Sequence, residues 1–135
     1  MDLAPLVEEQ LKTLFPGFLG IRFVSVDPSR VEAKLEVRPE LCTLGGQLHG
    51  GALMALAATL GAGGAFFNLP QGARTTTIES KTNFTGAAPA GVTVTGVSTP
   101  AHQGRRLMVW QTEVRDEAGR LLGLVTQTQM VLLPD

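Results

Sequence analysis

Apolar residues near the N-terminus recur at a helical spacing. Between Leu3 and Phe15 they return every three or four positions, which predicts a short amphipathic helix within residues 1–16. Asp2 stands where an N-cap is expected, and Pro16-Gly17 is expected to end the helix. The chain is therefore predicted to begin with one short helix.

After this helix the pattern changes to a period of two. Residues from Val31 to Arg38 alternate between apolar and charged side chains, as a strand with one buried face does. Ile21–Asp27 also has strand composition, and the intervening Asp27-Pro28-Ser29-Arg30 has turn composition. The two segments are predicted to form a β-hairpin.

A long uncharged stretch follows. From Leu41 to Ala73 the chain contains no Asp, Glu, Lys or Arg. Within it, residues 50–67 are rich in Ala and Gly and predict a long helix that ends at Asn68–Gly72. The helix is long enough to span a bilayer, but its glycines lower both its helicity and its hydrophobicity. A helix buried against the sheet of a soluble protein explains the same pattern.

The rest of the chain has strand composition interrupted by turns. The order of elements is α-β-β-α-β-β-β-β, which predicts one α+β domain over residues 1–135, with a long central helix wrapped by an antiparallel sheet. The last four strands are predicted at Thr75–Phe84, Val92–Thr99, Leu107–Asp116 and Leu121–Leu133, separated by turns at Gly86–Gly91, His102–Arg105 and Glu117–Arg120.

Composition excludes several classes of function. With 135 residues and a net charge of −1, the chain has no basic field for nucleic acid or an anionic membrane. The lone Cys42 cannot form an internal disulfide, which favours the reducing cytoplasm or simply reflects no need for such bonds. No basic region precedes an apolar run at the N-terminus, so no secretory signal is predicted. Cys42, His49 and His102 are not spaced along the chain as metal ligands are, so no metal site is predicted. We expect no other cofactor.

The start of the long helix holds the strongest candidate chemistry. The segment Gly45-Gly46-Gln47-Leu48-His49-Gly50-Gly51 leads into it. The free N–H groups of a helix start can hold a developing negative charge. His49 is therefore interpreted as a site residue, although a histidine here could also simply bond to the backbone. Gly50 and Gly51 could equally permit close packing of the helix on the sheet.

With this motif and this order of elements, the chain from about Gly17 to Leu133 resembles a hotdog-fold thioesterase. The subgroup that it resembles most is the phenylacetate-degradation type of acyl-CoA thioesterase. No single segment is decisive, but their order and spacing together are specific for the fold. The segments that carry the resemblance are Gly46–Gly51, Leu53, Leu56-Ala57, Thr77–Phe84, Pro89–Gly91, Gly104–Leu107 and Val114–Leu121.

The resemblance implies an assembly and a site. Such enzymes form dimers in which two sheets join edge to edge, often paired into tetramers, and their two active sites lie at the dimer interface. The amide at the start of the central helix polarises the thioester carbonyl, and His49 and Gly50 match those positions. Thr77 matches a hydroxyl that helps hold the attacking water or the site carboxylate.

Two positions depart from the family pattern. Nine residues after the histidine such enzymes usually carry the Asp or Glu that acts as nucleophile or general base, whereas this chain has Ala58. Loss of a positioned base typically costs ~10²–10⁴-fold in rate. Six residues before the histidine, Asn or Gln is replaced by Thr43, which reaches less far.

Glu79 is the first candidate for a substitute carboxylate. It lies two positions after Thr77, so both side chains are expected on one face of a strand, although an exposed Glu79 paired with Lys81 is the simpler interpretation. Glu40 is a weaker candidate, in the loop before the motif. Cys42 lies in the same loop, and a structural role suits it better than a nucleophilic one.

Substrate contacts are predicted at Thr43, Gly51 and Ala58, and at Arg105 and Arg106, whose guanidinium groups could meet the phosphates of coenzyme A. The two arginines could instead be edge charges that discourage aggregation. Trp110 and Phe66-Phe67 are expected to belong to the core or to line an acyl pocket.

Two functions follow from these residues. The first is hydrolysis of an acyl-CoA thioester by a cytoplasmic homodimer or homotetramer, slowed by the lack of a carboxylate at Ala58. The second is a non-catalytic acyl-CoA binder or regulatory module that retains the fold without the base.

Overall fold

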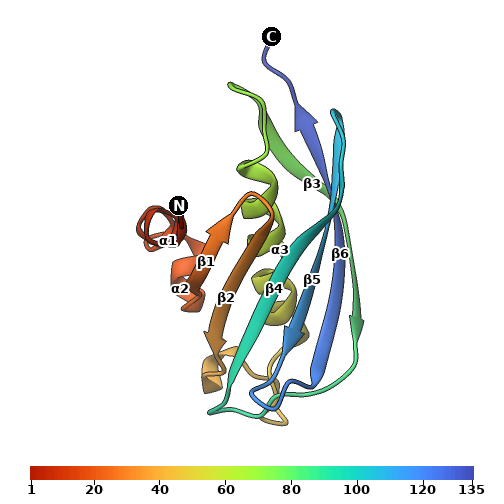
Figure 1. Ribbon diagram of the computed structural model, residues 1–135. Coiled ribbons are helices and arrows are strands. Elements are labelled where there is room, and N and C mark those ends of the chain that lie inside the picture. Colours follow the sequence, from red (N-terminus) through yellow and green to blue (C-terminus); the bar gives the residue numbers. More distant parts are fainter.

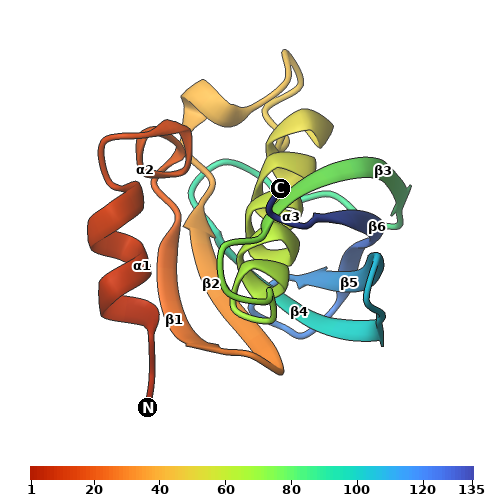
Figure 2. The same cartoon turned by 90° about the horizontal axis from the view of Figure 1, so that it is seen from above.

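A computed structural model describes all residues from 1 to 135. One long helix, α3, lies in the hollow of a single curved antiparallel sheet whose strands follow the order β1-β2-β4-β5-β6-β3 (Figures 1 and 2). This is the α+β architecture predicted from the pattern. The helices are α1 (Ala4–Leu11), α2 (Phe15–Leu19) and α3 (Gly50–Phe66), with a 3-10 turn η1 (Pro39–Leu41), and the strands are β1 (Arg22–Asp27), β2 (Arg30–Glu36), β3 (Arg74–Phe84), β4 (Thr93–Gln103), β5 (Leu107–Arg115) and β6 (Leu121–Leu132).

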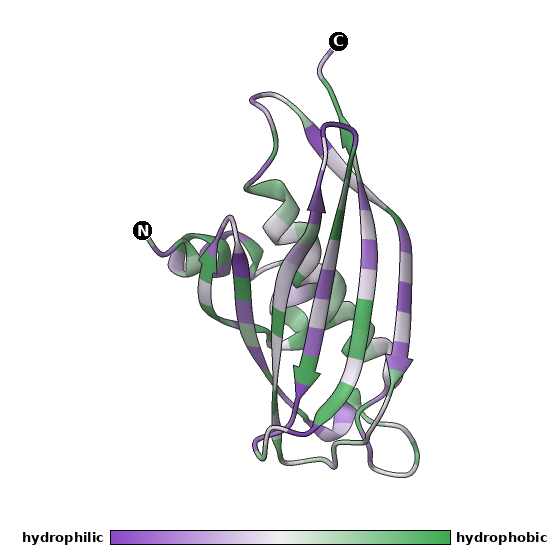
Figure 3. Cartoon of the chain, turned by 45° about the vertical axis from the view of Figure 1, so that its right-hand side comes forward, coloured by the Kyte–Doolittle hydropathy of each residue, from purple (hydrophilic) through white to green (hydrophobic).

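The predicted hairpin is confirmed. Strands β1 and β2 pair antiparallel and close on the pair Asp27–Arg30. The apolar residues of the alternating segment, from Val31 to Val37, are buried while the charged ones between them remain more accessible. Figure 3 shows the same banding of hydrophilic and hydrophobic residues along the strands. The period-two pattern therefore set both the strand and the face that it buries.

The N-terminal helix differs from the prediction. Two helices, α1 and α2, replace the one expected, because Leu14 is extended (φ −107°, ψ −175°) and interrupts the helical path. Pro16 and Gly17 do not end a helix but lie inside α2, where proline fits the first turn. A Cβ on Gly17 would come within 2.2 Å of the Lys12 carbonyl oxygen, so only glycine allows this close turn. The helix ends instead at Gly20, with φ +87°.

Asp2 holds α1 against the sheet. It lies one residue before the N-cap, Leu3, so the prediction of an Asp2 cap is off by one position. Its Oδ1 accepts hydrogen bonds from the backbone N–H groups of Ala4 and Val26, both at 2.9 Å. These bonds lower the pKa of the Asp2 carboxyl below its ordinary value. One carboxylate thus joins the start of α1 to β1.

Small residues on α3 bring it close to the sheet. A Cβ on Gly64 would lie 2.4 Å from the Trp110 ring, and one on Gly61 would lie 2.3 Å from the Gln127 side chain. The leucines of α3 meanwhile fill the main core, where burial of each contributes about 1.5–3 kcal/mol. The helix therefore approaches the sheet closely at its glycines and fills the core with its leucines. Its fully buried leucines are Leu56 and Leu60, and Leu53 is 4% exposed.

Strand β3 forms one edge of the sheet and is exposed along almost its whole length. It pairs with β6 on one side only. Only Thr75 and Thr82 among its residues are partly buried, and Ile78 and Phe84 are among the exposed large apolar side chains of the molecule. The opposite edge, β1, is by contrast covered by α1 (Figure 2). No helix has the combination of length and apolar character that spanning a bilayer requires.

Candidate active site at the start of the central helix

His49 is the N-cap of α3. Its backbone is extended (φ −63°, ψ 135°), and its Nδ1 accepts a hydrogen bond of 2.8 Å from the Gly51 N–H. A neutral imidazole that accepts at Nδ1 carries its proton on Nε2. The exposed ring therefore offers Nε2–H as a donor beside the helix start. Gly51 has no room for a side chain here, since a Cβ would lie 2.9 Å from Nδ1.

The N–H of Gly50 is left without a partner. As the first helical residue it has no acceptor inside its own helix, and none of the backbone hydrogen bonds in loops and caps is donated by Gly50. The Phe84 ring lies beside it, 3.0 Å from the position that a Gly50 Cβ would occupy. An unpaired donor next to an aromatic wall, at the positive end of a helix, suits the binding of a polarised carbonyl oxygen.

Backbone hydrogen bonds hold the loop before the helix. The Thr43 N–H donates to the Gln47 oxygen at 2.7 Å, and Gly46 completes the turn with φ +80°. Leu48 and His49 donate to Ala88 and Leu41, each at 2.8 Å. The Thr43 side chain is exposed at the base of this turn. The position of His49 therefore depends mainly on backbone geometry.

A small hollow adjoins His49. Its volume is about 230 Å³, and α2 and the first turns of α3 form two of its walls. Glu40 and Cys42 both line it, but the Cys42 thiol donates to the Arg38 carbonyl oxygen at 3.3 Å, which agrees with its predicted structural role. Most of the lining is apolar. The full set is Phe15, Leu19, Glu40, Leu41, Cys42, His49, Gly51, Ala52 and Ala55.

A second polar group lies further along α3, beside Ala58. The carbonyl oxygen of Ala58 accepts from Gln127 Nε2 at 3.4 Å, and Gln127 Nε2 also donates to Gln129 Oε1 at 2.9 Å. Thr77 joins the group by donating its hydroxyl to the same Gln129 oxygen at 2.5 Å. Gln127 and Gln129 are 0% and 1% exposed.

Sequence reasoning missed these two glutamines. Their signal is present in the printed sequence, because Gln127 and Gln129 continue the inward-facing alternation of Val125 and Val131. A polar residue at a core position of a strand needs a hydrogen-bonding partner. Such a residue therefore marks a buried polar site.

Glu79 does not share a face with Thr77, so that prediction is wrong. Thr77 pairs with Gln129 and Glu79 pairs with Thr128, which leaves Ile78 as an extra residue in a β-bulge. The bulge turns Glu79 to the face of the sheet opposite Thr77. Glu79 is exposed there and forms no ion pair with Lys81, whose Nζ bonds to Asn83 instead.

Arg105 and Arg106 lie at the other end of the molecule from His49. They form the turn between β4 and β5, whereas α3 starts at the opposite end of the sheet (Figure 1). Since α3 has 17 residues, about 25 Å separates its two ends. Trp110 is fully buried in a small core near this end, and Phe66, 60% exposed, stacks edge-on against Phe67. Within one chain none of these residues contributes to the His49 group.

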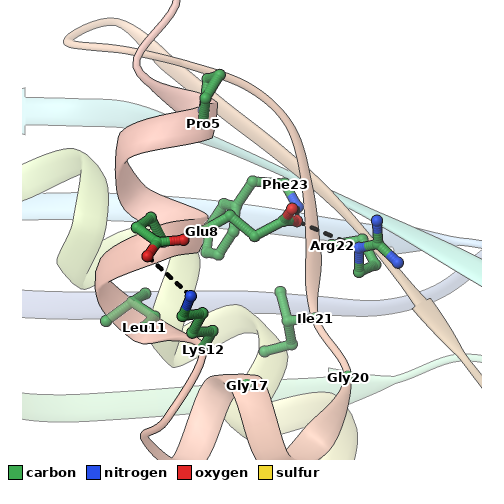
Figure 4. A pocket seen from close by; sticks show the side chains of 10 residues that line it. Pro5, Glu8, Leu11, Lys12, Gly17, Gly20, Ile21, Arg22 and Phe23 are labelled. Atoms are coloured by element: carbon green, nitrogen blue, oxygen red, sulfur yellow. Dashed lines mark hydrogen bonds and ion pairs between the residues drawn. The ribbon is translucent and has the colours of Figure 1, made fainter.

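A second cleft, about 360 Å³ in volume, shares no lining residue with the hollow beside His49. It lies between α1 and β1 (Figure 4). Glu8 there accepts from the Phe23 N–H at 2.9 Å and from Arg22 Nε at 3.3 Å, and Glu9 pairs with Lys12 at 2.8 Å. The charges of this cleft are thus matched within it.

Apart from Glu79, Arg105 and Arg106, the predicted site residues form two groups in one chain. The helix-start group consists of Thr43, His49, Gly50 and Gly51. The mid-helix group consists of Ala58 and Thr77, joined by Thr75, Gln127 and Gln129. Nine residues place Ala58 about 13 Å along the helix from His49 and on its opposite side. One chain does not bring the two groups together.

Comparison with known proteins gives consistent results. The family model described as Thioesterase superfamily matches residues 45–122. A putative esterase of Deinococcus radiodurans is 37% identical over 118 residues, covering 84% of this chain and 71% of the relative. A 1,4-dihydroxy-2-naphthoyl-CoA hydrolase of Escherichia coli is 36% identical over 105 residues, covering 78% of this chain and 76% of the relative. The crystal structure of a thioesterase from Haemophilus influenzae superposes with a TM-score of 0.90 at 26% identity, covering 96% of this chain and 90% of that one.

Proposed function

This chain belongs to the thioesterase superfamily and has the hotdog fold, and on that premise we propose that it hydrolyses an acyl-CoA thioester to the free acid and coenzyme A. The observation that carries the proposal is the unpaired Gly50 N–H at the start of α3. In the reaction a water oxygen bonds to the carbonyl carbon, the C–S bond breaks, and the leaving sulfur takes up a proton from the water.

The helix start supplies the electrostatic part of the mechanism. As water attacks, negative charge develops on the carbonyl oxygen, and the Gly50 N–H donates to it with the support of the helix dipole. One such preorganised donor is worth ~10²–10³ in kcat. The Nε2–H of His49 offers a second donor on the same side, and the Gly51–Nδ1 bond fixes its tautomer.

We propose that a second copy of the chain completes the site. The helix-start group of one subunit and the mid-helix group of the other would then face each other across the dimer. The exposed edge β3 supports this arrangement, because it is long, unpaired on one side and carries the exposed Ile78 and Phe84. Each subunit is one domain over residues 1–135 in this proposal, and pairs of dimers would form the tetramer.

The substrate contacts follow from the same arrangement. The hollow beside His49 is mostly apolar and would take a compact acyl group. Arg105 and Arg106 are too distant to serve the His49 of their own chain, so we assign them to the coenzyme A phosphates at a site in the assembly. An aromatic acyl group is the first to test, since the phenylacetate-type resemblance and the name of the Escherichia coli relative both point to one.

Ala58 favours the second candidate function, a non-catalytic acyl-CoA binder. A methyl group there supplies no base. Steady-state turnover on a panel of short, long and aromatic acyl-CoAs, compared with calorimetric binding of the same compounds, separates the two functions. Turnover supports the hydrolase. Tight binding without turnover would replace it with the binder.

The role of the Gly50 N–H is tested by two matched variants. Gly50→Pro removes the donor at a helix position where proline is tolerated, and the extended backbone of His49 suits a residue before proline. Gly50→Ala adds a comparable Cβ against Phe84 but keeps the N–H. We expect kcat to be ~10²-fold lower for the proline variant than for the alanine variant. Equal kcat values in two folded variants would remove Gly50 from the mechanism.

A further inference from the structure

The contacts around Gln129 allow only one assignment of donors and acceptors. The Thr75 hydroxyl donates its proton to the Met130 carbonyl oxygen at 3.0 Å, so it can only accept from Gln129 Nε2, at 3.1 Å. This contact orients the Gln129 amide, with its nitrogen toward Thr75 and its oxygen toward Thr77. Through Thr75, the backbone carbonyl of Met130 thus determines the orientation of the buried side chain of its neighbour in sequence, Gln129.

This orientation determines which hydrogen bonds Thr77 can form. Gln129 Oε1 is an acceptor only, so the Thr77 hydroxyl must donate to it, at a distance of 2.5 Å. Gln127 Nε2 donates to the same oxygen at 2.9 Å and holds it in place. The one proton of the Thr77 hydroxyl is therefore directed inward. Both lone pairs of its oxygen are left as acceptors, on a residue that is exposed at the sheet edge.

Helix α3 leaves space for the side chains of this group. Gln127 lies across α3 between Ala58 and Gly61, and a Cβ at position 61 would come within 2.3 Å of the Gln127 carboxamide. Gln127 Oε1 has no hydrogen-bonding partner although it is buried. A buried amide with an unpaired oxygen costs stability. Unpaired buried polar groups of this kind occur at functional sites.

We propose that Gln129 is a positioning residue for the hydrolysis, acting through Thr77 in place of the carboxylate that is absent at Ala58. With its proton committed to Gln129, Thr77 Oγ1 accepts a hydrogen bond from the attacking water and directs the water lone pair at the thioester carbon. The C–O bond forms, the C–S bond breaks, and the water proton goes to the leaving sulfur. Thr77 orients the water and keeps its own proton throughout. This inference rests on the proposed function, and specifically on the dimer that brings Thr77 to the site.

A double-mutant cycle tests whether Gln129 acts through Thr77. Gln129→Leu frees the Thr77 hydroxyl to point its proton outward, and Thr77→Val removes the hydroxyl. We expect each to lower kcat about tenfold with KM within twofold of wild type, since the effect lies on the water and not on binding. The double variant should be no slower than Thr77→Val alone, because Gln129 acts only through Thr77. Thr77→Ser retains the hydroxyl and should recover most of kcat.

The outer face of the sheet offers a matched control. Gln111 Nε2 donates to Thr126 Oγ1 at 3.2 Å, so the same two residue types pair on the opposite face of neighbouring strands. Gln111→Leu and Thr126→Val should leave kcat unchanged. Where Gln129→Leu does not fold, Thr75→Val replaces it, since loss of the Thr75 hydroxyl removes the acceptor that holds the nitrogen of the Gln129 amide. This variant should lower kcat severalfold.

The possible outcomes separate the two proposals. A wild type that binds acyl-CoA without turnover would overturn the proposed function and this inference together. A wild type with turnover and a folded Gln129→Leu variant at wild-type kcat would overturn only the inference. Additive losses in the cycle would also overturn it, because they would show that Gln129 affects the rate independently of Thr77.

Discussion

The two halves of the candidate site are built in different ways. The helix-start half depends on backbone groups, namely the unpaired Gly50 N–H and the hydrogen bonds that hold the loop before it. The mid-helix half depends on side chains, with a chain of directed hydrogen bonds through Gln127, Gln129 and Thr77. A site made of backbone tolerates many substitutions, whereas a side-chain network fails when one partner is lost. The mid-helix half is therefore the more fragile half.

The largest expected effect comes from introducing a carboxylate into the mid-helix half. Ala58→Asp places a carboxylate at the position where the family resemblance predicts a base, and a positioned base can raise kcat ~10²-fold or more. Partial burial of Ala58 will raise the pKa of the new acid and lower stability somewhat. The measurement is kcat/KM for Ala58→Asp and Ala58→Glu on the acyl-CoA panel. Folded variants no faster than wild type on any substrate would contradict this prediction.

The same variant sharpens the comparison between the halves. In the Ala58→Asp background the carboxylate takes over the orientation of water. Gln129→Leu should then lose much less than the tenfold expected in the wild-type background. An undiminished loss would show that Gln129 does not substitute for the carboxylate.

Mixing two impaired variants tests whether the halves come from different chains. Gly50→Pro subunits lack the first half and Thr77→Val subunits lack part of the second. After unfolding and refolding together, half of the dimers are mixed, and each holds one intact site, so activity should recover to about a quarter of wild type. Each protein refolded alone is the control. Recovery that does not exceed the average of the two controls would place both halves in one chain.

His49 is expected to matter less, about tenfold in kcat/KM, because it supports a donor that the backbone already supplies. His49→Ala removes both the cap and the Nε2–H, and loss of an N-cap costs ~1 kcal/mol of stability. His49→Asn keeps a capping oxygen but removes the ring. We expect the asparagine variant to recover the stability but not the rate. Wild-type kcat/KM in His49→Asn would assign His49 a capping role alone.

The smallest effect lies outside both halves, at Asp2. The backbone N–H groups of Ala4 and Val26 lower the pKa of this carboxyl below 3.8, so its folded pKa lies below its unfolded one. Its contribution to stability is present above the unfolded pKa and is lost as the pH falls through the folded pKa. Asp2→Asn should therefore lower Tm at pH 7 and leave it nearly equal to wild type in strong acid. The kcat at pH 7 should not change, and a Tm difference that is independent of pH would contradict the assignment.

The features that could be predicted from the sequence are those marked by a repeating or local pattern of residues. Strict alternation from Val31 to Val37 placed one strand and its buried face, and the uncharged stretch placed α3 within one residue of its observed end. His49 and Gly50 were predicted because a helix start carries its chemistry in the backbone and is marked by local glycines. Pro16 and Gly17 were misread because both residues also fit the first turn of a helix.

The remainder depended on tertiary contacts. The bulge at Ile78, which separates Glu79 from Thr77, arises from pairing between β3 and β6, fifty residues apart in the sequence. The direction of the hydrogen bonds through Gln129 likewise depends on Thr75 and on the Met130 carbonyl, which only the sheet brings together. Local pattern decides which elements form and which face each buries, since both follow from neighbouring residues. The orientation of a buried side chain is decided by whichever donors and acceptors the folded chain places around it.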